Sequence, residues 1–200
     1  MEELFKGLCR VLENEGMENP EECFRKASPK ELQQLTELVG VQVPKFTGFY
    51  AEYCPKKVTG FHKADVRFLN MEGIMREAEE MAPGCFLKDF GIFVFATTVG
   101  GHALLIDTND VKDGDPRVLG IDRNFIYEDF DNPEKIRIDE TFVSKESEEY
   151  FSDGETEASL ENVRRGAIEL EGSFVRFLQK LSNDQYDDAE KLMDEHVAWH

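Results

Sequence analysis

The sequence predicts an α+β protein, in which helices and strands occupy separate stretches of the chain. Apolar residues recur at helical spacing from Leu4 to Tyr53. The pattern then shifts to β over Lys57–Leu69, Asn70 caps a helix through Met81, and β-branched and aromatic residues mark strands from Phe90 to Tyr127, where Gly100-Gly101 is typical of a hairpin turn. An amphipathic helix follows from Ser173. Helices, then strands, then a closing helix are the element order of an α+β fold.

The N-terminal part is expected to contain three main helices. The first has a stripe of apolar residues on one face, at Leu4, Leu8, Val11 and Leu12. The second begins at Ser28-Pro29-Lys30-Glu31, where Ser and Glu can form a capping box and Pro takes the first helical position. The third follows Val43-Pro44 and carries aromatic residues at helical spacing, at Phe46, Phe49, Tyr50 and Tyr53.

The central part is expected to form the sheet. Phe90–Ala96 is rich in β-branched and aromatic residues, which indicates a buried central strand, and His102–Asp107 is its hairpin partner. Asn109–Pro116 is predicted to be a polar loop. Arg117–Ile121 and Asn124–Tyr127 are predicted as two short strands or one bent strand.

The C-terminal part begins with a change of composition. Asp139–Glu161 holds nine acidic residues and one basic residue, which predicts a solvated acidic loop, although residues 157–168 could be helical. Ser173 then caps a helix with Phe174, Phe177, Leu178 and Leu181 on its inner face. A last helical stretch is expected from Asn183 to near Trp199.

The expected organisation is one domain with two additions, because 200 residues suit a single domain. Residues 1–27 form an N-terminal helical extension. Residues 28–182 form the α+β domain, with an acidic insertion at 139–166. Residues 183–200 form a C-terminal helical tail.

The charge balance restricts the class of partner. The chain has 42 acidic and 23 basic residues, which gives a formal charge of −19. Such a charge disfavours nucleic acid, whose phosphates need clusters of Lys and Arg, and it disfavours anionic membranes. It favours a basic protein partner, although acidity also serves solubility. The oligomeric state is left open.

The expected location is the cytoplasm. The chain begins with acidic, amphipathic sequence and lacks both the basic start of a signal peptide and an apolar run long enough to span a membrane. The irregular spacing of Cys9, Cys23, Cys54 and Cys85 predicts reduced, mostly buried thiols.

The sequence does not support any of four kinds of chemical site, so no catalytic residue, metal or cofactor is expected. A calcium loop starting at Asp107 would place Val111 at position 5 and Lys112 at position 6, where an oxygen ligand and Gly are required. Zinc ligation lacks paired ligands at short spacing. A phosphate-binding loop lacks the motif around Gly100-Gly101. A nucleophilic triad of Cys85, His102 and Asp107 has no local support.

Five short motifs, in order, resemble the SUKH superfamily of bacterial immunity proteins and a related fungal cell-wall-synthesis regulator. They are Leu38–Pro44 with the aromatic residues that follow it, Phe68–Ile74, Gly91–Asp107, Pro116–Asp122, and Ser173–Leu178. The resemblance spans residues 38–181. Tyr53-Cys54-Pro55 replaces the Asn-Gly pair common in the family, and the acidic segment at 139–166 resembles an insertion.

This resemblance implies a mixed, mainly antiparallel sheet with N-terminal helices and a C-terminal helix packed on the sheet. It also implies binding without catalysis, most concretely neutralisation of a basic toxin such as a nuclease or deaminase. The motif residues are assigned to the fold: Gly100, Gly101, Asp107, Val118, Phe174 and Phe177.

Partner contact is predicted at two acidic segments, where aromatic side chains accompany charge as at many binding hot spots. The predicted residues are Asp107, Asp110, Asp113, Asp115, Tyr127, Glu128, Asp129, Phe130 and Asp131. Two other classes remain open. One is a regulatory or scaffold protein that makes transient contacts through its acidic segment. The other is a cysteine-dependent enzyme that uses Cys85.

Overall fold

The computed structural model describes residues 1–129, 131–132, 135–139, 155–186 and 188–198. Its helices are α1 (Glu2–Asn14), α2 (Pro29–Val39), α3 (Pro44–Tyr53), α4 (Met71–Glu79), α5 (Gly84–Leu87), α6 (Leu160–Gly166), α7 (Phe174–Ser182) and α8 (Ala189–Ala198). Two short 3-10 turns are η1 (Pro20–Cys23) and η2 (Lys88–Phe90). Its strands are β1 (Phe24–Arg25), β2 (Cys54–Pro55), β3 (Thr59–Phe61), β4 (Val66–Phe68), β5 (Ile92–Thr97), β6 (Ala103–Lys112), β7 (Asp115–Ile121), β8 (Ile126–Glu128), β9 (Ile136–Asp139), β10 (Glu155–Glu157) and β11 (Ile168–Glu171). The predicted α+β class is confirmed.

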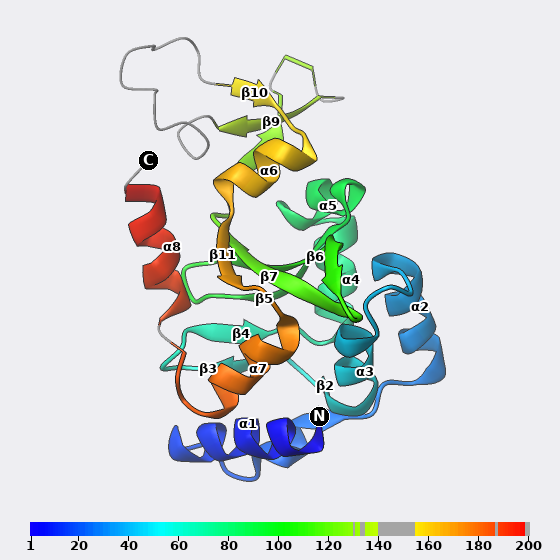
Figure 1. Cartoon of the computed structure of the whole chain (residues 1–200), viewed down its shortest axis with the longest axis vertical. Coiled ribbons are helices and arrows are strands. Elements are labelled where there is room, and N and C mark those ends of the chain that lie inside the picture. The colour runs from blue at the N-terminus through cyan, green and yellow to red at the C-terminus, as the bar shows by residue number, and fades with distance from the viewer. Residues whose placement is uncertain (130, 133–134, 140–154, 187, 199–200) are drawn as a thin grey trace.

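The described strands form one main sheet and two small ones. Six strands lie in the order β11-β7-β6-β5-β4-β3, and each neighbouring pair is antiparallel. The small sheets are β10-β9-β8 and β1-β2. In Figure 1 the three-stranded sheet and α6 lie at one end of the molecule, and α1 lies at the opposite end. The expected antiparallel sheet is therefore present, with a second sheet at its end.

The core is a cluster of aromatic rings between α3, α7 and the main sheet. Phe46 of α3 meets Phe174 of α7 with ring centroids 5.1 Å apart, and Phe95 of β5 meets Phe177 of α7 at 5.8 Å. All four side chains are fully buried. Edge-to-face geometry of this kind adds to the stability gained from burial alone. The prediction that the helix from Ser173 packs on the sheet is confirmed.

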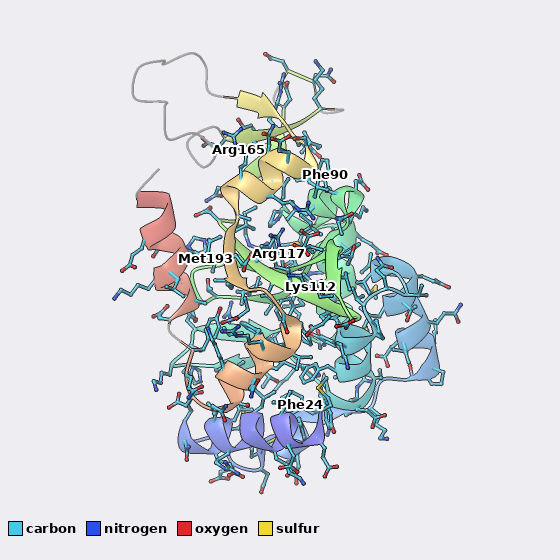
Figure 2. All side chains as sticks on the ribbon, viewed as in Figure 1. Phe24, Phe90, Lys112, Arg117, Arg165 and Met193 are labelled. Carbon is cyan, nitrogen blue, oxygen red and sulfur yellow. The ribbon has the colours of Figure 1, made fainter. Side chains whose placement is uncertain are left out.

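The first helix belongs to this core. Its residues Leu8 and Leu12 are fully buried, and α1 packs against α7, which lies next to it in Figure 1. Phe24, which follows η1, lies between α1 and the rest of the molecule in Figure 2. The predicted N-terminal extension therefore packs directly on the α+β domain and contributes to its interior.

The second helix begins with the predicted capping box. The Glu31 N–H donates to Ser28 Oγ at 3.3 Å, and the Ser28 N–H donates to Glu31 Oε2 at 2.8 Å. The helix ends at Gly40, whose φ of 84° favours glycine. Both helix boundaries were therefore readable from local sequence.

Replacing Ser28 with Ala is expected to destabilise the protein by about 1 kcal/mol, because an N-terminal N–H of α2 loses its acceptor. Thermal unfolding should then occur roughly 2–4 °C lower than in the wild type. Ser28→Asn is the control, since Asn caps helices as well as Ser does and should keep the midpoint. Equal midpoints for the Ala and Asn variants would contradict the capping role.

The predicted loop over Asn109–Pro116 is wrong, because β6 continues to Lys112 and β7 begins at Asp115. The pairing register shifts between Asp107 and Val111, and the turn itself is only Asp113-Gly114. Both turn residues have positive φ, 52° and 77°. A strand pairs through its backbone and does not require alternating apolar side chains. The side chains of this segment are mostly polar, so its sequence shows no strand pattern.

Contact with α3 supports the tip of this β6–β7 hairpin. The Lys45 N–H donates to Gly114 O at 3.0 Å, and a Cβ on Gly114 would lie 2.6 Å from Pro44 Cγ.

The structure also changes the boundaries of two other predicted elements. Asn124–Tyr127 contributes β8, which belongs to the second sheet, and the last helix begins at Ala189 rather than Asn183.

The four cysteines are free thiols, and Cys9 and Cys54 are buried. Burial, followed in size by the charges of Glu21 and Glu13, raises the pKa of Cys9 to about 12. Within the ranges that the structure describes, no helix has the length and apolar character needed to cross a membrane.

Candidate functional site

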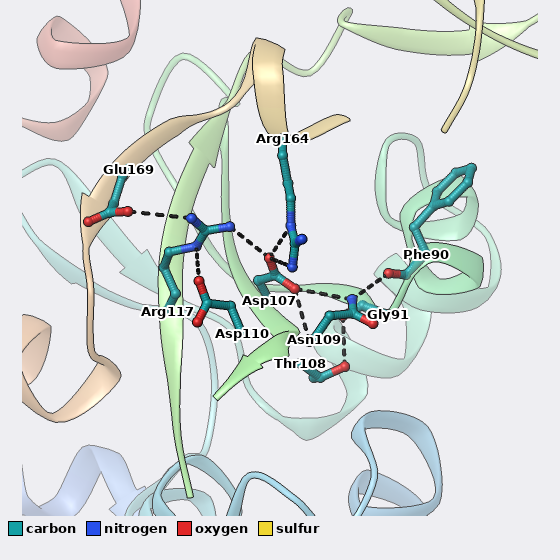
Figure 3. A network of polar contacts seen from close by, with 9 residues as sticks. All are labelled: Phe90, Gly91, Asp107, Thr108, Asn109, Asp110, Arg117, Arg164 and Glu169. Carbon is teal, nitrogen blue, oxygen red and sulfur yellow. Dashed lines mark hydrogen bonds and ion pairs between the residues drawn. The ribbon is translucent and has the colours of Figure 1, made fainter. Parts of the chain in front are cut away.

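Asp107 is the centre of an internal ion cluster on the main sheet. Its side chain is fully buried near the middle of β6, and two arginines from different elements converge on its Oδ2 (Figure 3). Arg117 of β7 donates through Nη2 at 2.9 Å, and Arg164 of α6 donates through Nε at 2.8 Å. The cluster joins α6 to the sheet.

The other oxygen of Asp107 organises the bulge in β6. Its Oδ1 accepts the Asn109 N–H at 3.0 Å and the Asn109 side-chain amide at 3.1 Å. The same amide donates to Phe90 O at 2.8 Å, and Thr108 donates its hydroxyl to Gly91 O at 2.8 Å. The carboxylate therefore also fixes the end of β6 to the segment that precedes β5.

These contacts settle the charge of Asp107. Burial alone would raise its pKa, but the hydrogen bonds from Arg117, Asn109 and Arg164 outweigh burial and hold the pKa below its ordinary value of 3.8. The carboxylate is therefore ionised at neutral pH and is matched by two guanidinium groups. The sequence predicts that Asp107 contacts a partner directly, but the structure encloses its side chain completely and leaves it no surface for such contact.

Two other predicted contact residues also serve the fold. Asp115 accepts the Ser173 hydroxyl at 2.5 Å and the Val175 N–H at 3.2 Å, so it supports the first turn of α7. Asp129 accepts Arg137 Nε at 2.9 Å and the Asp131 N–H at 2.9 Å, so it closes the turn between β8 and β9. Hydrogen bonding of this kind makes partly buried carboxylates structural.

The remaining predicted residues lie nearer to solvent. Asp113, Glu128 and Asp131 are exposed, and Tyr127 is half-buried. Asp110 is half-buried and lies 3.5 Å from Arg117 Nε. Phe130 lies outside the described residues. The residues predicted for partner contact therefore lie at two separate places, the β6–β7 hairpin and the region of strand β8.

A groove of about 830 Å³ runs beside β8 and includes two of the predicted residues, Tyr127 and Glu128. Its other lining residues come from the end of α4, from α5 and from the segments around β8 and β9: Glu80, Met81, Ala82, Cys85, Phe86, Arg123, Asn124, Ile126 and Asp139. Pockets of this size, with apolar walls and a few polar groups, are the usual form of a binding site.

Arg123 fixes one side of the groove. It donates to Gly101 O at 2.6 Å and to Ala82 O at 2.5 Å, and its Nη2 lies 3.1 Å from Glu77 Oε1. Glu77 is itself buried. The guanidinium therefore joins the β5–β6 turn to the α4–α5 segment, and the Glu77 carboxylate neutralises its charge inside the protein.

The acids on the groove differ from those of the internal clusters. Glu80 and Glu128 are exposed, and neither carboxylate forms an ion pair with any residue in the described ranges. Phe86 and Tyr127 are half-buried beside them. The groove can therefore offer apolar contact and uncompensated negative charge to one ligand.

The nucleophilic triad that the sequence did not support is also not assembled in the structure. Within the described part of the chain, no hydrogen bond or ion pair joins Cys85, His102 and Asp107. The His102 ring instead lies 3.3 Å from Asp122 and 3.0 Å from Asp194. Burial raises the pKa of the Cys85 thiol, which keeps it protonated at neutral pH. The described residues also contain no group of three His, Cys, Asp or Glu side chains placed to hold a metal ion.

The sequence did not predict that Arg117 and Arg164 bind Asp107, or that the α4–α5 segment lines a groove. Arg117 and Arg164 lie 47 residues apart, so only the fold brings them together. One signal was present. Met81 and Phe86 flank Pro83-Gly84, where an apolar pattern continues past the end of a helix, and such a pattern indicates buried or ligand-facing side chains.

The structure is that of an α+β domain with an acidic, partly apolar groove beside β8. No protein-family model matches the chain, and neither the curated proteins nor the solved structures yield a match.

Proposed function

We propose that this chain is a non-enzymatic, cytoplasmic protein-binding domain of the SUKH type, and that it is an immunity protein that neutralises a basic toxin. The groove beside β8 carries the proposal, because it combines apolar walls with the exposed carboxylates of Glu80 and Glu128. The formal charge of −19 acts in the same direction. A basic partner would be attracted from a distance and would then meet a shaped surface.

The motif residues of the resemblance occupy positions that suit a shared fold, which supports the proposal. Gly101 has a φ of 98° at the β5–β6 turn, where other residues are strained. Phe174 and Phe177 anchor α7 in the core, and Val118 is fully buried on β7. Asp107 is the acceptor for two arginines. These five motif residues therefore each have a structural reason to be present.

A nuclease or deaminase is a fitting target on electrostatic grounds. An enzyme that acts on nucleic acid needs a basic surface to hold phosphates. An acidic protein seated there competes with the substrate for the same cations, and association between opposite charges can be fast. Binding should therefore weaken as salt is raised.

The test is capture of the partner from the native cell lysate with the tagged full-length chain, at low and at high salt, followed by an activity assay. We expect one stoichiometric basic protein, captured less at high salt. Alone, that protein should degrade or deaminate nucleic acid, and an equimolar amount of this chain should stop the reaction. Co-expression of the two should also restore growth of cells that the partner alone arrests.

A different pattern of capture would overturn immunity. Several substoichiometric partners without toxic activity would favour a scaffold or regulatory protein, the alternative that the resemblance to the fungal regulator suggests. A captured enzyme whose activity is unchanged by this chain would exclude neutralisation.

A further inference from the structure

We propose that the C-terminal helix α8 is a pH-sensitive latch on the main sheet, which the charged form of His102 holds in place and which loosens when His102 loses its proton. The latch involves α8 and the β5–β6 turn. It therefore goes beyond the proposed function and does not depend on it.

Two glycines of the sheet make room for α8, which lies at the side of the molecule in Figure 1 and packs on β7. Met193 is 1% exposed, and a Cβ on Gly120 of β7 would lie 2.6 Å from the Met193 sulfur. A Cβ on Gly100, in the β5–β6 turn, would overlap the Glu190 carboxylate, which accepts the Gly100 N–H. The docked position of α8 is therefore built into the sheet.

The apolar contacts of α8 are limited. Among the described side chains of this helix, Ala189 and Met193 are buried and Leu192 is half-buried. The Ala189 N–H donates to Ala64 O at 2.9 Å, which fixes the start of the helix to the β3–β4 turn. A helix of 10 residues is only marginally stable by itself in water. The polar contacts further along α8 therefore decide how firmly it stays docked.

His102 provides the central polar contact. Its side chain is 12% exposed and lies between two carboxylates, with Nδ1 3.3 Å from Asp122 Oδ2 and Nε2 3.0 Å from Asp194 Oδ1. Asp122 follows β7, whereas Asp194 lies on α8. The charged ring also attracts Glu190 of α8. His102 thus joins the sheet to the helix.

Only the protonated ring can satisfy both of its neighbours. An imidazolium has an N–H on each nitrogen, whereas a neutral imidazole has one N–H and one bare nitrogen. Ionised carboxylates only accept hydrogen bonds, so a neutral ring must turn its lone pair towards Asp122 or Asp194. Histidine is the side chain that changes charge between about pH 5 and 8. Docking of α8 favours the bound proton, so docking weakens as pH rises through that range.

The other charged groups at this contact act in the same direction. Asp65 of the β3–β4 turn accepts the Val99 N–H at 3.0 Å and is hydrogen-bonded to Glu190. Arg123 donates to the turn that precedes His102, but its guanidinium is engaged by Glu77. The set is Asp65, Asp122, Arg123, Asp188, Glu190 and Asp194. All but Arg123 are acidic, and negative charge favours the protonated ring.

Hydrogen exchange of the full-length chain tests the latch, because a released α8 loses the helical hydrogen bonds that protect its amides. Exchange is followed by mass spectrometry from about pH 5.5 to about pH 8.5, which spans the histidine range. Each rate is divided by the intrinsic rate at the same pH to give a protection factor. We expect the protection of α8 to fall roughly 3- to 30-fold, the effect of losing two partly exposed ion pairs, while that of α7 does not fall in parallel.

Two pairs of variants test the histidine and its partner. His102→Gln removes the titratable ring and should flatten the response of α8, whereas His62→Gln replaces an exposed histidine and should leave it unchanged. Asp194→Asn should weaken the response, because an amide can accept from the charged ring or donate to the neutral ring. Glu195→Gln removes the same charge from an exposed residue of α8 and should keep the wild-type response. Wild-type protection of α7 would show that each variant is folded.

Specific results would overturn the latch. Protection of α8 that does not change with pH, or that falls in His102→Gln as it does in the wild type, would exclude control by His102. Equal losses in α7 and α8 would show that pH acts on the whole fold. Equal responses of Asp194→Asn and Glu195→Gln would exclude the contact with Asp194. Because none of these measurements uses a partner, the latch can fail while neutralisation stands, and the reverse also holds.

Discussion

Replacing Phe177 with Ala is expected to lower the free energy of unfolding by about 3–5 kcal/mol, among the largest effects of any single substitution in this chain. The ring is fully buried and contacts Phe95 at 5.8 Å and Tyr186 at 5.0 Å between centroids. Its removal leaves a cavity where α7 meets the sheet, and packed aromatic neighbours can collapse into it only partly. The midpoint of thermal unfolding should fall by roughly 6–20 °C.

Gln179→Ala is the matched control for Phe177→Ala, because Gln179 lies on the same helix with an exposed side chain. Its effect should stay within about 0.5 kcal/mol. Phe177→Leu should cost less than Phe177→Ala, since it retains more of the buried apolar volume. A melt of Phe177→Ala that coincides with that of the wild type would show that the ring is not part of the core.

Replacing Asp107 with Ala is expected to destabilise the protein by about 3 kcal/mol, the lower end of the range for breaking a buried ion pair. The substitution leaves Arg117 and Arg164 without their shared acceptor, and it frees the bulge held by Asn109. The lower end applies because both arginines retain some exposure, 20% and 33%. Chemical denaturation at pH 7 measures the difference directly.

Asp110→Ala is the control for Asp107→Ala, because Asp110 faces the same Arg117 at 3.5 Å but is 41% exposed. An exposed pair of this kind contributes about 0–1 kcal/mol. If both variants lost a similar free energy of unfolding, burial would not distinguish the two carboxylates. That result would contradict the role of Asp107 as the buried acceptor for two arginines.

Low pH should selectively reduce the contribution of Asp107 to the free energy of unfolding. Its pKa in the folded protein lies below the ordinary value of 3.8, so the folded state favours the ionised form. The stability that this shift provides is fully present above pH 3.8 and is lost as pH falls through the lower, folded-state pKa. The stability gap between wild type and Asp107→Asn should therefore narrow below pH 3.8. A gap that stays constant there would contradict the shift.

The helix boundaries and the core aromatics could be predicted because local sequence determines them. Ser28 and Gly40 act through atoms within a few residues of themselves. Phe46 and Phe49 repeat at helical spacing, and Phe174 and Phe177 do the same, so each pair faces inward once its helix forms. Tertiary packing had only to bring these faces together.

The strand at Asn109–Lys112 could not be predicted in this way. Its side chains are polar, and the residues form a strand because the β6–β7 hairpin continues past the bulge and its tip rests on Pro44. Pairing with a neighbouring strand can override weak local preference. The same reason separates β8 from β7, since its partner is β9 in a different sheet.

The sequence by itself determined the α+β class, the caps, the inward faces of the helices and the acidic charge of −19. Only the tertiary structure decided which acids stay free to meet a ligand. Asp107 and Glu128 look alike in the sequence, but Arg117 and Arg164 enclose the first while the second stays exposed on the groove. The physical reason is that a carboxylate is buried only where distant parts of the chain supply opposite charge and hydrogen bonds to replace water.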